Sequence, residues 1–125
     1  MLATRSPHEA YRRVDFDARV AGADPGQLVT LCYEQLISAL GTAVYANGLG
    51  DNLLKSQSLT RALSAITALQ LGVSGESGVA SALRQLYEAA RRSILDSALT
   101  FDEKALGIIR QDFIDISRAM QSAAA

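Results

Sequence analysis

The sequence has little of what catalytic and metal-binding sites are usually built from. Its 125 residues include one cysteine, Cys32, and one histidine, His8. A single cysteine excludes an internal disulfide and a cysteine-rich metal site, and it is typical of a protein kept in a reducing compartment. Cys32 lies among apolar residues, where a free thiol usually packs as a small hydrophobe. His8 lies beside Pro7 in a polar N-terminal segment, so neither residue is expected to be catalytic.

The sequence motifs of common enzyme classes are also missing. No serine lies in a GxSxG motif, and no Glu-x-x-His pair offers the ligands of a metal-binding helical bundle. The glycine-rich stretch GVSGESG at 72–78 has neither a GxGxxG nor a Walker spacing, which argues against phosphate binding. The sequence therefore predicts a binding protein that is not an enzyme and that carries no cofactor and no metal.

Net charge and hydropathy limit the partners and the cellular location that the sequence supports. The formal net charge is −1, so the chain has no overall attraction to nucleic acid or to a membrane surface. No uninterrupted apolar run approaches the roughly 18 residues that a membrane span needs. The first residues, MLATRSPHEAYRR, lack the apolar core of a signal peptide. We therefore expect a cytoplasmic protein with no nucleic-acid partner and no direct membrane insertion.

Helical periodicity dominates the rest of the sequence, and no segment shows the alternation of a β-strand. Short polar breaks such as Asn47-Gly48 and the 72–78 stretch separate four apolar-striped segments. We predict an all-α fold, an antiparallel up-down-up-down four-helix bundle over residues 24–121, with an N-terminal arm at 1–23 and a frayed tail at 122–125. The four helices are expected at 25–46, from 51 or 52 to 71, at 78–99 and at 102–120.

The first of these helices has more apolar surface than one bundle contact requires. Around a helical wheel its apolar residues spread over about 180°, against the 100° or slightly more that a packed bundle helix shows. One interpretation is that the N-terminal arm, through Tyr11, Val14 and Phe16, covers the excess. The other is that the excess forms a groove for an apolar helix of another protein. Both hold if the arm is a movable cover.

Several stretches, taken in order, resemble the FliS family of flagellar secretion chaperones. These are AYRRV at 10–14, ADPGQLVTLCYEQLISAL at 23–40 and GESGVASALRQLYEAARRSIL at 75–95. The family shows a tyrosine in the arm, a proline entry into a Leu-Val-x-x-Leu-Tyr helix, and a later Leu-Tyr-x-x-x-x-Arg-Arg-Leu helix. In this chain the matching residues are Tyr11, Pro25, Leu28, Tyr33, Leu86, Tyr87, Arg91, Arg92 and Ile94.

The resemblance implies a cytoplasmic chaperone for flagellin. Such a protein binds the disordered C-terminal segment of flagellin, prevents premature polymerisation, and presents the cargo to the export apparatus through the cytosolic domain of FlhA. The arm residues Tyr11, Val14 and Phe16 would cover the groove and contact the export gate. The expected flagellin-binding groove comprises Leu28, Val29, Tyr33, Leu36, Ile37, Leu86, Tyr87 and Ile94.

A structural role remains the alternative. Here the first bundle helix would dimerise with a second copy, and there would be no exchangeable client. The sequence leaves the oligomeric state open between a monomer and a weak homodimer.

Overall fold

A computed structural model describes residues 7–124, which form five α-helices and, within that range, no strand. The all-helical prediction is confirmed, but the count of four helices is wrong, because part of the expected arm is itself a helix. The portions of the predicted arm and tail at residues 1–6 and 125 lie outside the described residues. The helices are α1 Pro7–Ala21, α2 Pro25–Leu49, α3 Asn52–Gly72, α4 Gly78–Leu99 and α5 Glu103–Ala124. Residues 122–124, expected to be frayed, continue α5.

Side-chain caps define where α2 and α3 begin. Asp24 accepts a hydrogen bond from the Gln27 backbone N–H at 2.8 Å, and the Gln27 side chain accepts one from the Asp24 N–H at 2.9 Å. This reciprocal pair satisfies two N–H groups that have no partner within the helix. The helix ends at Gly50, whose φ of 71° is left-handed. Asp51 then caps α3, so only two residues separate α2 from α3.

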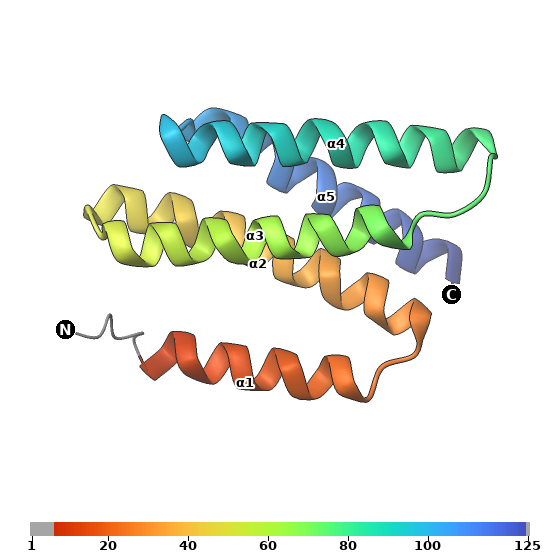
Figure 1. The fold of residues 1–125 in the computed structure, drawn as a ribbon, viewed down its shortest axis with the longest axis horizontal. Coiled ribbons are helices and arrows are strands. Elements are labelled where there is room, and N and C mark those ends of the chain that lie inside the picture. The colour runs from red at the N-terminus through yellow and green to blue at the C-terminus, as the bar shows by residue number, and fades with distance from the viewer. Residues whose placement is uncertain (1–6, 125) are drawn as a thin grey trace.

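Helices α2 to α5 pack in a ring, and α1 lies outside it. Along the ring α2 contacts α3, α3 contacts α4, α4 contacts α5, and α5 returns to α2. Consecutive helices run in opposite directions, as their short connections require, and α1 runs along the outer edge beside α2 (Figure 1). Among the described helices, the backbone of α1 comes close to that of α2 alone. The chain therefore has a four-helix body and one peripheral helix.

Three aromatic rings form the centre of the body. Tyr33 of α2, Tyr87 of α4 and Phe113 of α5 are buried, with ring centroids 5.3 to 6.4 Å apart. The two tyrosine hydroxyls share a hydrogen bond of 2.8 Å. Each aromatic pair adds about 0.5–1.5 kcal/mol beyond the burial of its area. These contacts join α2 to α4 across the diagonal of the ring.

By length and composition alone, α2 is apolar enough to cross a membrane. That observation is weak, because the central helix of a globular protein passes the same test. In this chain α2 contributes more residues to the core than any other helix, and both α3 and α5 pack against it. Its apolar character is therefore accounted for largely by burial within the body.

Candidate functional site: an apolar groove beside α1

An open groove of about 700 Å³ lies between the C-terminal half of α1 and the ends of the body helices. The N-terminal part of α2, the C-terminal part of α3, the start of α4 and Met120 of α5 form its other walls. We call it the apolar groove. Its lining residues are Phe16, Val20, Pro25, Leu28, Val29, Cys32, Gln35, Ser64, Ala65, Ala68, Leu69, Gly72, Val73, Ser74, Ser77, Val79, Ala80, Leu83, Tyr87 and Met120.

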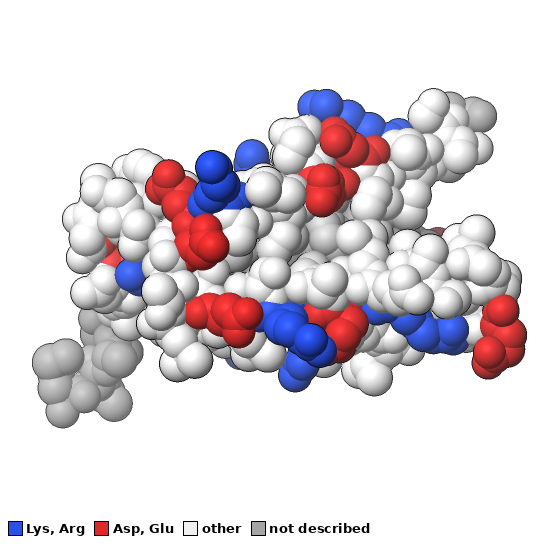
Figure 2. Space-filling model, turned by 90° about the horizontal axis from the view of Figure 1, so that it is seen from above, with Lys and Arg blue, Asp and Glu red and all other residues white. Residues whose placement is uncertain are grey.

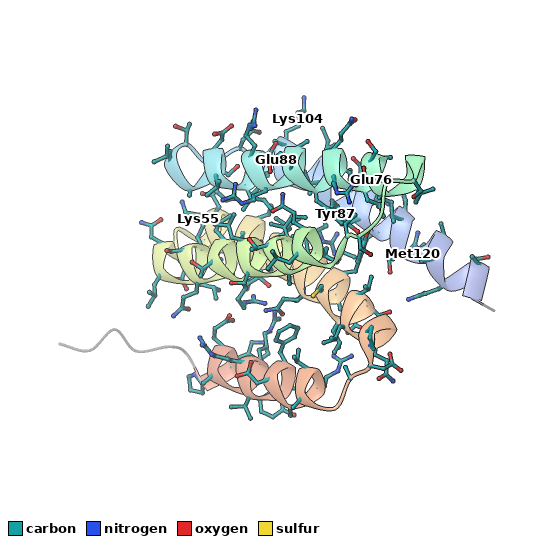
Figure 3. All side chains as sticks on the ribbon, turned by 45° about the vertical axis from the view of Figure 1, so that its right-hand side comes forward. Lys55, Glu76, Tyr87, Glu88, Lys104 and Met120 are labelled. Atoms are coloured by element: carbon teal, nitrogen blue, oxygen red, sulfur yellow. The ribbon has the colours of Figure 1, made fainter. Side chains whose placement is uncertain are left out.

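None of these twenty lining residues is an acid, a lysine, an arginine or a histidine. Charges of both signs are scattered over the neighbouring surface, but the molecule has a mostly uncharged notch beside the C-terminal end of α5 (Figure 2). Met120 and Glu76 mark this end of the molecule, and Lys55 marks the other (Figure 3). Such a surface gains free energy by covering apolar side chains and offers nothing to a strongly charged ligand.

The helix α1 turns only part of its apolar surface toward the body. Phe16 and Val20 are half-buried and line the groove. Tyr11 and Val14 are 70% and 68% exposed, so the expectation that they cover the groove is wrong for this conformation. The reason is helical geometry, because positions 11 and 14 lie on a different face of α1 from positions 16 and 20.

Most of the contacts that hold α1 are polar. Arg12 donates hydrogen bonds to Ser38 at 2.8 Å and to Thr42 at 3.4 Å. Near the other end of α1, the exposed Arg19 pairs with Glu34 at 3.0 Å. Exposed pairs of this kind contribute about 0–1 kcal/mol, so they position α1 without binding it tightly.

Beneath α1 a second, smaller cavity of about 300 Å³ separates it from α3. We call this the polar cavity. Glu9, Arg13, Asp17 and Arg61 line it, together with serine, threonine and glutamine side chains of α2 and α3. Phe16, Gln35 and Ser64 line both the polar cavity and the apolar groove, so the two adjoin. Because of this cavity, α1 is incompletely packed against α3. The dispersion contacts that are lost there make α1 easier to displace.

One buried ion pair crosses the polar cavity. The guanidinium Nε of Arg61 lies 2.5 Å from a carboxylate oxygen of Glu9, and the side chains are 13% and 4% exposed. Burial lowers the pKa of Arg61 below its ordinary value, and the charge of Glu9 acts in the opposite direction. Arg61 also donates to Gln35 at 3.5 Å. Sequence reasoning missed this pair, because nothing in the sequence brings positions 9 and 61 together.

The predicted groove residues fall into three groups. Leu28 and Val29 line the apolar groove, and their contact with a client stays a prediction. Tyr33, Leu36 and Ile94 are fully buried in the core and offer no surface to a client in this conformation. The expectation that these three side chains are open to a client is therefore corrected.

The other three expected residues are also enclosed to differing degrees. Tyr87 is buried but borders the floor of the groove. Ile37 and Leu86 are half-buried against the core and are not part of the groove lining. Core and surface positions of a helix use the same apolar residues, so the sequence pattern could not separate them.

The sequence pattern also missed the α3 and α4 walls of the groove. Ala65, Ala68 and Leu69 of α3 and Val79 and Leu83 of α4 line it. A signal was available in the sequence, since α3 carries only two charged residues, Lys55 and Arg61, over its whole length. A helix on the outside of a protein normally has a charged face, so this scarcity indicates a covered or contacted surface.

Ionisable chemistry in the groove is limited. Cys32 borders the groove, where burial raises the pKa of its thiol and disfavours the nucleophilic thiolate. Within residues 7–124 no three histidine, cysteine or acidic side chains gather in a way that could hold a metal ion. The arrangement is suited to binding an apolar surface.

Two comparisons with known proteins bear on the family of this chain. The family model described as flagellar protein FliS matches residues 7–125. The flagellar secretion chaperone FliS of Salmonella typhimurium strain LT2 is 31% identical over 108 residues, which cover 84% of this chain and 80% of that protein. The match includes α1 and all four helices of the body, and so every helix that lines the groove. This chain belongs to the FliS family.

Proposed function

We propose that this protein is a cytoplasmic flagellar secretion chaperone whose client is the disordered C-terminal segment of flagellin. The single observation that supports this role best is the apolar groove, an uncharged channel of about 700 Å³ left open along a member of this family. A free amphipathic segment of flagellin would cover its own apolar face there. Its premature polymerisation would then be blocked, because the same face is no longer available.

The physics of such binding suits a cargo that must be released. A disordered segment gains free energy from apolar burial as it folds on the groove, but it loses conformational entropy at the same time. A large contact area then gives only moderate affinity, which permits transfer to the export apparatus. Tyr11 and Val14 remain exposed on α1, so we also propose them as the surface that contacts the cytosolic domain of FlhA.

Titration with a synthetic C-terminal segment of the flagellin from the same organism tests the proposal. Circular dichroism should show a gain of helix on mixing that exceeds the sum of the separate spectra. Two substitutions on α4 provide a matched comparison, since Val79 in the groove is 71% exposed and Leu99 at the far end is 90% exposed. Both Val79→Glu and Leu99→Glu should fold normally, because neither site is buried.

We expect Val79→Glu to weaken binding by about tenfold or more, since a carboxylate would lose water against an apolar client. Leu99→Glu should change affinity less than twofold. Equal effects of the two variants would place the client elsewhere on the protein. No binding at high micromolar concentration, together with a dimer in sedimentation experiments, would favour the alternative role as a self-associating bundle.

A further inference from the structure

Helix α1 lines the apolar groove, which is the proposed client site, through Phe16 and Val20. Glu9, Phe16 and Val20 contact the body, and they lie seven and eleven residues apart along the helix, counted from Glu9. At about 100° per residue, those steps return to within about 20° of the same face. The charged end of this face lies over the polar cavity and its apolar end lies in the groove.

Arg61 is the feature of the body that constrains what can replace α1. Its side chain is 13% exposed, and its Nη2 atom is buried with no hydrogen-bond partner within residues 7–124. The carboxylate of Glu9 balances this charge in the present conformation. When α1 leaves, water can reach the guanidinium, but a client lying along the same face of α3 would bury it again. A guanidinium buried without an acceptor is strongly unfavourable.

We propose that Arg61 determines client specificity, because a client helix that displaces α1 must place its own carboxylate on Arg61 where Glu9 now lies. The client would follow this acid with apolar side chains seven and eleven residues later, matching Phe16 and Val20. The inference rests on the proposed chaperone function and adds to it. The proposal predicts that the client needs a negative charge at one end of a contact that is otherwise uncharged.

The test uses the full chain and the synthetic flagellin C-terminal segment as the probe. Glu9→Gln removes the competing carboxylate, so the segment should bind this variant more tightly than the wild type. Adding Arg61→Gln to Glu9→Gln should then weaken binding by at least about tenfold, which corresponds to the lower end of the coupling measured for close charge pairs at interfaces. If Arg61 serves only to hold α1, the second substitution would leave affinity unchanged or raise it, which would overturn the proposal.

A second set of measurements identifies the partner of Arg61. Each acidic residue of the segment is changed in turn to its amide. One of these changes should weaken binding to Glu9→Gln by about tenfold and have no effect on Glu9→Gln/Arg61→Gln. If no acidic residue shows this coupling, the proposal about Arg61 is wrong. Binding of the segment would in that case still support the chaperone function. If the segment binds none of the variants, the chaperone function fails, and this inference with it.

A variant in which the charges of Glu9 and Arg61 are exchanged controls for a loss of folding in Arg61→Gln. Glu9→Arg/Arg61→Glu keeps an opposite pair inside the chain, so the fold should survive even where Arg61→Gln alone is unstable. This variant should bind a segment in which the coupled acid is changed to lysine at least about tenfold better than the unchanged segment. The reverse preference, or no preference, would overturn the proposal.

Discussion

The hydroxyl groups of Tyr33 and Tyr87 lie 2.8 Å apart in the centre of the bundle, and both side chains are buried. They belong to α2 and α4, which face each other across the ring of helices and make no close backbone contact. The hydrogen bond therefore fixes the separation of two helices that both supply groove residues.

Removing both of these hydroxyls should cost less stability than the sum of the two single removals. Tyr33→Phe or Tyr87→Phe leaves the remaining hydroxyl buried without its partner, and we expect a loss of about 1–3 kcal/mol in the free energy of unfolding. The double variant should lose less than the sum of the two, because no hydroxyl is then left unsatisfied. Urea denaturation measures all three, with the exposed Tyr45→Phe as a control that should change stability little. Additive losses would show that the hydrogen bond does not couple the two residues.

Alkaline pH should destabilise the protein through the same pair. Burial raises the pKa of both Tyr33 and Tyr87 above the value near 10 of an unfolded tyrosine. Above that pH the unfolded chain has lost these protons while the folded chain retains them. The free energy of unfolding therefore falls as pH rises, by up to about 1.4 kcal/mol per pH unit for each tyrosine. Well below pH 10 both states keep these protons, so the two residues contribute no pH dependence there.

Denaturation curves at pH 8, 10 and 11 measure this loss. The variant Tyr33→Phe/Tyr87→Phe provides the comparison, because lysine and other groups titrate equally in both proteins. We expect the wild type to lose more stability than the double variant over this interval. Parallel pH profiles would contradict the assignment of the alkaline loss to these two residues.

Alanine substitution should change stability in opposite directions at two glycines, one inside α5 and one just after the end of α2. At Gly107, within α5, a methyl group would meet open space, and the backbone is helical. Gly107→Ala should therefore raise stability by about 0.5–1 kcal/mol through helix propensity. At Gly50 the φ of 71° is left-handed, so Gly50→Ala should lower stability by about 1 kcal/mol. Thermal unfolding of the two variants measures the difference, and a change of the same sign in both would contradict it.

The sequence predicted α2 to α5 well because the ends of these helices have local causes. The Asp24-Pro25 entry, the cap at Asp51 and the break at Gly72 all fall within a few residues of the observed ends. The helix at Pro7–Ala21 was missed because its residues are mostly polar, which is also typical of a solvated N-terminal arm. Its helical form is stabilised by contacts with α2 and α3, which no local pattern reveals.

The candidate site was predictable only in part. The excess apolar width of α2 includes Leu28 and Val29, which line the apolar groove, while their binding of a client stays a prediction. It also included Leu36, which is fully buried, because hydropathy does not distinguish a core position from an uncovered one. The Glu9–Arg61 pair depends on a contact between residues 52 positions apart, so periodicity could not predict it. Packing between helices that are distant in the sequence decides which apolar face stays open. The periodicity of a single helix carries no information about that packing.

Helix α1 should open more readily than the body, and Phe16 should control that opening. Its apolar contacts with the body are few, and its polar contacts are mainly exposed, so hydrogen exchange in residues 7–21 should be faster than in α2 to α5. Phe16→Ala removes a half-buried ring and should raise exchange in α1 by about tenfold, with little change in α4. Tyr11→Ala removes an exposed ring from the same helix and should have no such effect. If protection of α1 survives Phe16→Ala, the buried pair of Glu9 and Arg61 holds the helix without help from the groove, and displacement by a client would then require that pair to break first.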